Sequence, residues 1–147
     1  MDITNEYQIT SDICTSGQPT ENQMKQIASQ GYECVFNLAM PDHEQSIDRE
    51  GSIVSSLGMT YVHLPVPFEA PTKEHLEEFS AFMDAVRGKK VWVHCIVNAR
   101  VSAFLFCYLQ ASRGMLPADA ATPVLRAWLP KMNDTWKAFL DYAPAQL

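Results

Sequence analysis

Short apolar runs alternate along the chain with longer segments in which apolar residues recur at spacings of three and four. Apolar runs bounded by glycine, proline and polar turn residues indicate strands. On this basis strands are predicted at Tyr7–Ile13, Cys34–Leu38, Met59–Leu64 and Val91–Val93. The last run is apolar throughout, as expected of a central strand that is covered on both faces.

Helices are predicted between these strands and after the last one. Thr20 is followed three residues later by Gln23, which is the pattern of a capping box, and Thr72 caps a second periodic segment. Residues 101–112 are apolar on nearly every side, so their helix is expected to run through the middle of the domain. The remaining helices are predicted at residues 42–57 and from Pro117 and Asn133.

The alternation of strands and helices predicts an α/β domain, and 147 residues are enough for one proper core, so residues 1–147 are expected to form a single domain. A hydrophobic content of 47% with 19% charged residues is typical of a globular protein. The net charge of −6 argues against nucleic acid as a partner. The chain lacks an apolar run of membrane-spanning length, and its first residues lack the pattern of a signal peptide. No membrane partner and a cytoplasmic location are therefore expected.

Four cysteines, at positions 14, 34, 95 and 107, lack the spacing of metal ligands, so free thiols with no metal and no cofactor are expected. Cys95 differs from the others because a short loop, Arg100 and a long apolar helix follow it. Loop N–H groups and the positive end of a helix attract an anion, and the same field favours thiolate over thiol. A nucleophile beside an anion site can attack phosphorus. The alternative interpretation is a buried structural cysteine.

The segment from His94 to Ser102 resembles the signature of the cysteine-dependent protein tyrosine and dual-specificity phosphatases, His-Cys-x-x-Gly-x-x-Arg-Ser/Thr. His94, Cys95 and Ser102 match this signature in type and position. Asn98 replaces the glycine, which is a mild change because asparagine tolerates a positive φ angle.

The arginine of the signature is displaced, since its position holds Val101 and Arg100 comes one residue earlier. Two arrangements are open. In the first, the loop is one residue shorter and Arg100 still reaches the phosphate. In the second, the loop keeps its length and Arg100 leaves the helix about 100° from the usual direction. The unchanged spacing between Cys95 and Ser102 favours the second.

Further segments resemble one branch of this superfamily, namely small stand-alone phosphatase-like domains, some of them fused to metallo-β-lactamase-like hydrolases. These segments are Ser16–Thr20, Val35–Leu38, Leu64–Val66 and Ala70–Thr72. The resemblance implies a three-layer protein tyrosine phosphatase-like fold, with a central, mostly parallel sheet of four to five strands flanked by helices.

The resemblance also implies roles for the loop residues. Cys95 is the expected nucleophile, and Arg100 is the expected phosphate ligand, with a solvated surface cation as the alternative. Ser102 either assists the thiolate or is an ordinary residue of the first helical turn. His94 is expected to brace the loop, because its side chain leaves the strand on the side opposite to Cys95. The expected phosphate-binding residues are Cys95, Ile96, Val97, Asn98, Ala99, Arg100 and Val101.

A general acid must protonate the leaving oxygen. The resembling family uses an aspartate in the loop after the strand that corresponds to Met59–Leu64, and here Pro67 occupies its place. Glu69 is the nearest substitute, with Asp42 and Glu44 as further candidates. A solvated surface glutamate is the alternative interpretation of Glu69.

Three functions remain open. The first is a cysteine-dependent phosphatase that hydrolyses a phosphomonoester in a phosphoprotein or a phosphorylated small molecule. The second is a catalytically impaired pseudophosphatase that binds phosphate or another anion. The third is thiol redox or sulfur-transfer chemistry at the same cysteine.

Overall fold

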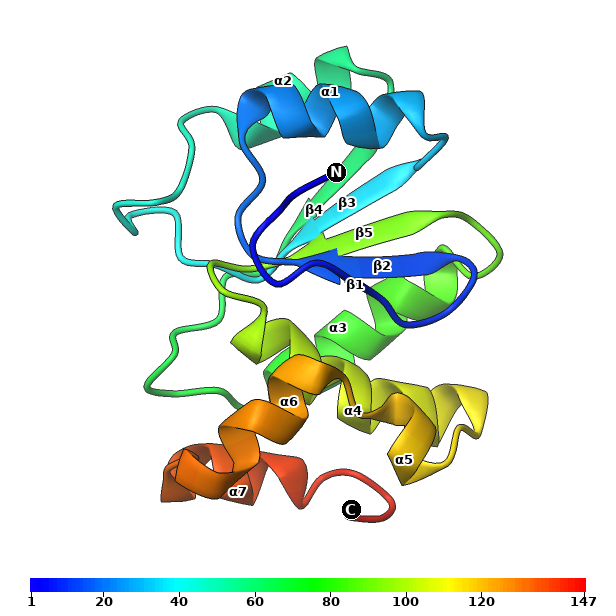
Figure 1. The fold of residues 1–147 in the computed structure, drawn as a ribbon. Helices are drawn as coiled ribbons and strands as arrows, with labels where there is room; N and C mark the ends of the chain where they lie inside the picture. The colour runs from blue at the N-terminus through cyan, green and yellow to red at the C-terminus, as the bar shows by residue number, and fades with distance from the viewer.

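A five-stranded sheet forms the centre of the computed structural model, which describes residues 1–147. In spatial order the strands are β1 (Tyr7–Gln8), β2 (Ile13–Ser16), β5 (Val91–His94), β3 (Cys34–Asn37) and β4 (Thr60–His63). β1 runs antiparallel to β2, and all other neighbouring strands are parallel (Figure 1). The prediction of a mostly parallel sheet of four to five strands is confirmed.

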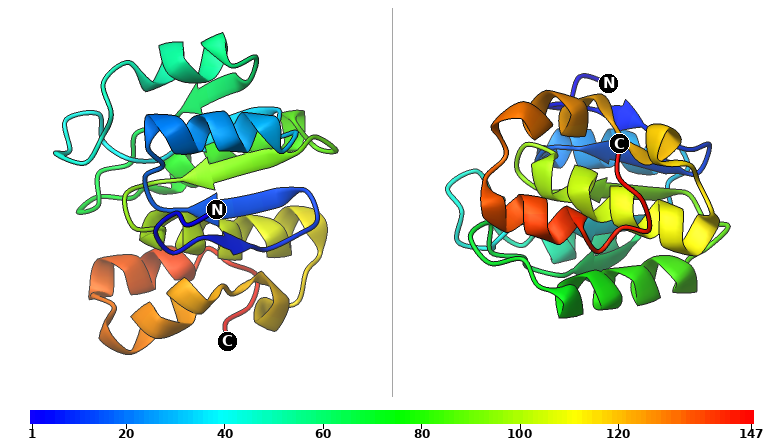
Figure 2. Two further views of the ribbon diagram at one scale, coloured as in Figure 1. Left: turned by 45° about the horizontal axis from the view of Figure 1, so that its top comes forward. Right: turned by 90° about the horizontal axis from the view of Figure 1, so that it is seen from below.

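Helices cover both faces of the sheet and give the three predicted layers (Figures 1 and 2). One face carries α1 (Glu21–Ser29) and α2 (Glu50–Ser56). The other face carries α3 (Lys73–Ala85), α4 (Ala99–Arg113), α5 (Pro117–Ala120), α6 (Pro123–Trp128), the 3-10 helix η1 (Leu129–Lys131) and α7 (Asp134–Leu140). None of these helices has the length and apolar character needed to cross a membrane.

Helix α4 lies in the interior, as its nearly uniform apolar sequence predicts. Every residue from Arg100 to Gln110 is buried, and the apolar ones join the main hydrophobic core with residues of β5 and α3. Gly114 ends the helix with φ 67°, a left-handed conformation that glycine adopts without steric cost. Burial on all sides fixes the start of α4 firmly against the end of β5.

The predicted threonine caps are confirmed. The Thr20 hydroxyl accepts a hydrogen bond from Gln23 N (3.1 Å), and the Gln23 side chain accepts one from Thr20 N (2.9 Å). Thr72 caps α3 in the same way, through the backbone and side chain of His75. Asn133 caps α7.

The prediction of one strand at Tyr7–Ile13 is wrong, because a turn divides the segment into β1 and β2. The backbone N–H groups of Ile9 and Thr10 both donate to Ile13 O, and the Thr10 hydroxyl accepts a hydrogen bond from Ile13 N (3.0 Å). Polar residues at 10–12 favour this turn through such local side-chain bonds.

The prediction of a helix at residues 42–57 is also wrong over its first half, since only α2 is helical. The His43 ring accepts a hydrogen bond from Gln45 N (3.0 Å), which offers the backbone an alternative to helix formation. Arg49 has φ 59°, a left-handed conformation that a continuous right-handed helix excludes. The irregular segment before α2 therefore remains a loop at the carboxyl end of β3.

Candidate active site

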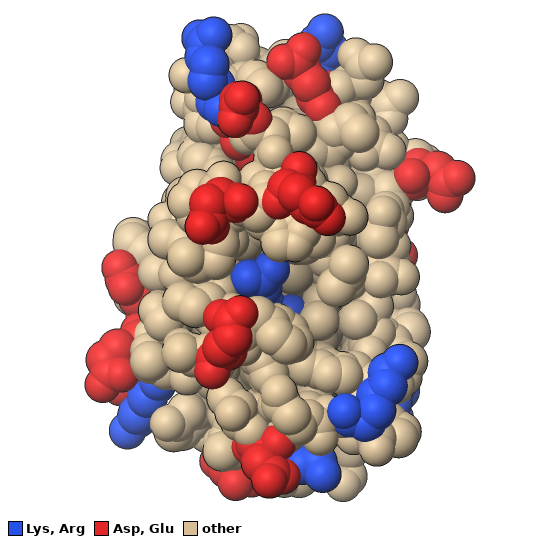
Figure 3. All heavy atoms as spheres, turned by 90° about the vertical axis from the view of Figure 1, so that its left-hand side faces the viewer, with Lys and Arg blue, Asp and Glu red and all other residues tan.

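The loop from Cys95 to Asn98 connects β5 to α4 at the carboxyl end of the central strand. Ligands of parallel sheets bind at this edge. Figure 3 shows this face of the molecule, where a basic side chain lies recessed in a hollow and acidic side chains stand around it. Cys95, the predicted nucleophile, lies at this edge.

N–H groups of other residues donate hydrogen bonds to the carbonyl groups of the loop on its outer side. The contacts are His94 Nδ1 to Cys95 O (3.0 Å), Gln18 N to Ile96 O (3.0 Å), Asn5 Nδ2 to Val97 O (2.9 Å) and Ser102 N to Asn98 O (3.1 Å). In a trans peptide unit the N–H points opposite to the C=O. The N–H groups of residues 96–99 therefore point away from these donors.

The backbone N–H groups from Ile96 to Val101 have no hydrogen-bond acceptor within the protein. A helix start leaves its first four N–H groups unpaired, here those of Asn98 to Val101, and the unpaired N–H groups of Ile96 and Val97 extend this row into the loop. Several successive N–H groups at the start of a helix form a concave anion-binding site, and the dipole of the helix adds to the positive potential. Helix α4 begins within this segment. This arrangement of donors suits an anion.

Asn98 sets the shape of the loop. It has φ 71° and ψ 6°, the left-handed conformation that its place in the signature predicts. Its side-chain Nδ2 donates to Asn5 O (2.8 Å) and to Thr15 Oγ1 (3.0 Å), which ties the loop to the N-terminal segment and to β2.

At Gly17 the backbone of the N-terminal part of the chain comes close to the outer side of the loop. A Cβ atom at this position would lie 2.3 Å from Ile96 O, closer than a real Cβ contact. The absence of a side chain lets the Gln18 N–H reach the same carbonyl. Glycine at position 17 thus allows the Ile96 peptide to turn its oxygen outward.

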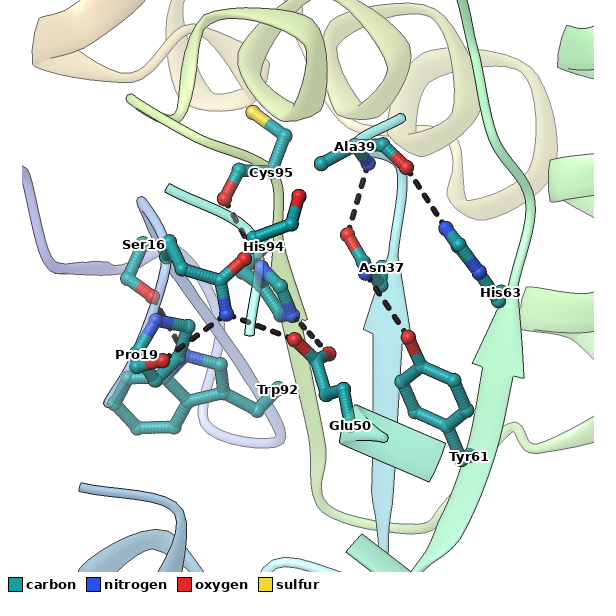
Figure 4. Close-up of polar contacts among 12 residues, drawn as sticks. Ser16, Pro19, Asn37, Ala39, Glu50, Tyr61, His63, Trp92, His94 and Cys95 are labelled. Atoms are coloured by element: carbon teal, nitrogen blue, oxygen red, sulfur yellow. Dashed lines mark hydrogen bonds and ion pairs between the residues drawn. The ribbon is translucent and has the colours of Figure 1, made fainter. Parts of the chain in front are cut away.

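His94 is completely buried behind the loop and lies between two acceptors. Its Nδ1 faces Cys95 O (3.0 Å), and its Nε2 faces Glu50 Oε2 (2.7 Å). Figure 4 shows the Cys95 sulfur pointing away from this pair, on the other side of the backbone. Both ring nitrogens therefore have a partner, which holds the ring in one orientation behind the loop.

Glu50 is the buried partner of His94 and also accepts a hydrogen bond from Gln18 Nε2 (2.8 Å). Burial acts to raise the pKa of this carboxyl group. Hydrogen bonding and charge attraction from His94, with hydrogen bonds from Gln18 and Tyr61, outweigh it and hold the pKa below its ordinary value. Glu50 is therefore ionised at neutral pH and keeps a negative charge against the ring of His94.

Arg100 is buried and has no carboxylate within ion-pair distance. Its Nη1 donates to Val66 O (2.8 Å), and its guanidinium lies over the ring of Phe68 (6.0 Å). It is directed into a cavity of about 370 Å³ that Ile96 and Val97 also line. Arg100 is thus not a solvated surface cation, and its role as phosphate ligand stays a prediction. A buried cation without a charge partner favours binding of an anion.

The remaining lining of this cavity contains two groups that can carry a proton, Glu69 and His43, together with Met40 and Phe68. The hydrogen bond from Gln45 N to His43 Nδ1 leaves Nε2 as the nitrogen able to donate. Asp42 and Glu44 do not line the cavity. His43 is not among the predicted site residues, and no spacing in the chain points to this placement.

The other predicted site residues differ in their surroundings. Cys95 is 1% exposed and has no hydrogen-bond partner for its sulfur within the protein; it is not among the residues that line the cavity, although the adjacent Ile96 is. The Ser102 hydroxyl donates to Ala99 O (2.6 Å), an ordinary bond within a helical turn, so its catalytic role stays a prediction. Val101 is buried in the core with its backbone N–H unpaired.

The three other cysteines are all free and buried. Burial raises the pKa of Cys107 to about 12 and, with the nearby charge of Glu6, the pKa of Cys14 to about 11. Burial also raises the pKa of Cys34. These residues stay protonated at neutral pH and are poor nucleophiles. His, Cys, Asp and Glu side chains form no group of three that could hold a metal ion.

Sequence reasoning missed Glu50 and the structural roles of Gln18, Asn5 and Thr15. Glu50 was missed because residues 42–57 were predicted to form one continuous helix. The position of Glu50 relative to β5 depends on the irregular loop that precedes α2. Gln18 and Gly17 belong to a segment noted only for its resemblance to a phosphatase branch. The hydrogen bonds of Asn5 and Thr15 depend on the turn between β1 and β2.

A family model described as "DSP-PTPase phosphatase fused to NAD+ Kinase" matches residues 2–129. A candidate phosphatase (DUF442) from Shewanella putrefaciens is 31% identical with a TM-score of 0.85, over 95% of this chain and 90% of that chain. A second crystal structure of this description from the same organism is 34% identical with a TM-score of 0.86, over 94% and 87% of the two chains.

More distant structures share the fold. Tk-PTP in its active form is 22% identical with a TM-score of 0.74, over 93% of this chain and 94% of that chain. TpbA from P. aeruginosa, solved with pTyr, is 13% identical with a TM-score of 0.65, over 96% and 91%. No curated protein matches the chain. These structures confirm the predicted protein tyrosine phosphatase-like fold, and the chain belongs to the DSP-PTPase phosphatase family that the matching model describes.

Proposed function

We propose that this protein is a cysteine-dependent phosphatase that hydrolyses phosphomonoesters through a phosphocysteine intermediate. The observation that carries the proposal is the set of six unpaired N–H groups in the loop that begins at Cys95, next to a buried Arg100 without a charge partner. These donors suit the three non-bridging oxygens of a phosphoryl group, whose charge the transition state spreads over them.

In the proposed reaction the Cys95 thiolate attacks phosphorus, so that an S–P bond forms as the bond to the leaving oxygen breaks. A side chain that lines the cavity gives a proton to that oxygen. Water then gives a proton back to that side chain as its oxygen attacks phosphorus, and the S–P bond breaks, which releases inorganic phosphate and regenerates the thiolate and the acid. The role of His94 and Glu50 is to position the loop.

Glu69 and His43 are the two proposed sources of the proton, because both line the cavity with Arg100. Glu69 has the place nearest to the aspartate of the resembling family, whereas His43 has its donating nitrogen fixed by Gln45. Removal of a general acid lowers the rate by about 10²–10⁴-fold, most strongly for a poor leaving group. Substitution of each residue separately identifies the donor.

Pro67 at the aspartate position favours a second candidate, an anion-binding module without catalysis. This module would use the same N–H groups and Arg100. It predicts that inorganic phosphate raises the melting temperature by mass action while phosphomonoesters are not turned over.

The proposed substrates are phosphoproteins and phosphorylated small molecules in the cytoplasm. TpbA, which shares the fold, binds pTyr. The family description names a fusion with NAD+ kinase, so nucleotides are also candidates. The narrower relationship to the branch fused to metallo-β-lactamase-like hydrolases stays a prediction.

Hydrolysis of p-nitrophenyl phosphate tests the proposal. The wild-type protein should release p-nitrophenolate, orthovanadate should inhibit the reaction, and Cys95→Ser should abolish it. Cys107→Ala is the matched control, because Cys107 is a buried thiol of α4 that plays no part in the reaction. Full activity of Cys95→Ser would exclude the mechanism.

A further inference from the structure

A second cavity of about 460 Å³ adjoins the one that contains Arg100. It lies between the loop and α6, which packs against α4 (Figure 1). Phe68 and Val97 line both cavities, so the two lie side by side. We call the second cavity the side groove. Its lining residues are Asn5, Phe68, Val97, Ala99, Pro123, Val124, Ala127, Trp128 and Lys131.

The wall of the side groove is aromatic and rigid. The Phe68 and Trp128 rings are stacked, with centroids 5.8 Å apart and an angle of 29° between their planes. Trp136 packs against both rings, and its indole N–H donates to Phe68 O (2.8 Å). Phe68 nevertheless remains 39% exposed and Val97 48% exposed. These side chains place apolar surface beside the proposed anion site, which suits an apolar part of a ligand.

Lys131 is the single charged residue of the side groove. It is exposed and forms no ion pair within the protein. The groove contains no acidic residue, although the protein as a whole has a net charge of −6. This arrangement suits a ligand with a flat apolar body and a second negative charge at some distance from the phosphate in the loop.

We propose that the side groove binds the leaving group of a nucleotide that carries a phosphomonoester on its ribose and a diphosphate elsewhere. This inference rests on the proposed function and specifies its substrate class. The loop holds the monoester phosphate, the base lies against the wall of Phe68 and Trp128, and Lys131 meets the diphosphate. Stacking on an aromatic side chain suits any base, because every base has a π-face. A tyrosine-phosphorylated peptide is the competing ligand.

Two variants test the side groove without changing the loop. Lys131→Glu reverses the charge, with Lys137→Glu as its matched control, because Lys137 is an exposed lysine of α7 outside the groove. Ala127→Trp places a large side chain in the groove from an exposed position of α6. Thermal melting of each variant checks that it is folded.

The readout is the ratio of kcat/KM for NADP⁺ to that for p-nitrophenyl phosphate, which lacks a second anion. Lys131→Glu should lower this ratio by about tenfold or more, as expected for loss of a charged contact, and Lys137→Glu should leave it unchanged. Ala127→Trp should also lower it. Calorimetric titration should give tighter binding of NADP⁺ than of NAD⁺, which has no monoester phosphate.

The two proposals can fail separately. Hydrolysis of p-nitrophenyl phosphate with a ratio that neither variant changes would overturn the side-groove inference and leave the phosphatase intact. A kcat/KM for a tyrosine-phosphorylated peptide above that for NADP⁺ would also overturn it. Absence of all hydrolysis, with NADP⁺ binding that Lys131→Glu weakens, would exclude the phosphatase but support the groove as a nucleotide site.

Discussion

Gly17→Ala tests whether the outer contacts of the loop determine its anion-binding shape. The added Cβ atom would lie 2.3 Å from Ile96 O, whereas real contacts of this kind lie at 3.0 Å or more, so the carbonyl or Gly17 must move by about 0.7 Å. Such overpacking against a backbone atom costs about 1–3 kcal/mol. Movement of this carbonyl also weakens its 3.0 Å bond with Gln18 N and turns the adjoining N–H group of the loop.

The matched control is Gly58→Ala. Gly58 has φ 83°, so alanine there is strained by about 1–2 kcal/mol, yet no atom lies within 4 Å of the new Cβ. Both variants should therefore unfold at lower urea concentration than the wild type, by similar amounts.

The decisive assay is the rise in melting temperature that inorganic phosphate or orthovanadate produces. We expect the rise in the wild type and in Gly58→Ala, and a strongly reduced rise in Gly17→Ala. A Gly17→Ala variant with the full rise would refute the reasoning, because it would show that the outward position of the Ile96 carbonyl does not matter for anion binding.

Three further predictions concern the charged groups. Glu50→Gln should remove about 3 kcal/mol of stability at neutral pH. Because the folded pKa of Glu50 lies below its ordinary value of 4.5, its contribution is complete above that pH and is lost as the pH falls through the folded pKa. Urea unfolding should thus show a difference from wild type that shrinks in acid, and a constant difference would contradict the ionised state. Arg100→Ala should lower kcat/KM about 10²–10³-fold, and Arg100→Lys should not restore it, because lysine lacks the planar fork; full activity of either would remove Arg100 from the site. Of Glu69→Gln and His43→Gln, the variant that loses the acid should slow hydrolysis of an alkyl phosphate about 10²-fold or more while p-nitrophenyl phosphate is affected much less. Equal rates in both variants and the wild type would show that neither residue donates the proton.

The sequence was informative where one local rule decided the outcome. The capping boxes at Thr20 and Thr72 were predicted from side chains that bond within one helical turn. The burial of α4 followed from a segment without a polar face, and the positive φ of Asn98 followed from the few residue types that tolerate it.

The sequence was uninformative where contacts join residues far apart in the chain. Glu50 reaches His94 across 44 positions, and Asn5 reaches Val97 across 92. The direction of Arg100 depended on the loop length and on Val66 O, which no spacing rule could choose. Local polar side chains also overrode the expected helix before Glu50.

The most direct test of the account is mass spectrometry of the protein quenched with acid during turnover of p-nitrophenyl phosphate. We predict one phosphoryl group on the peptide that contains Cys95, visible during turnover and lost after the substrate is consumed. Turnover without any phosphoryl group on this peptide, or with the group on another residue, would contradict the proposed role of Cys95.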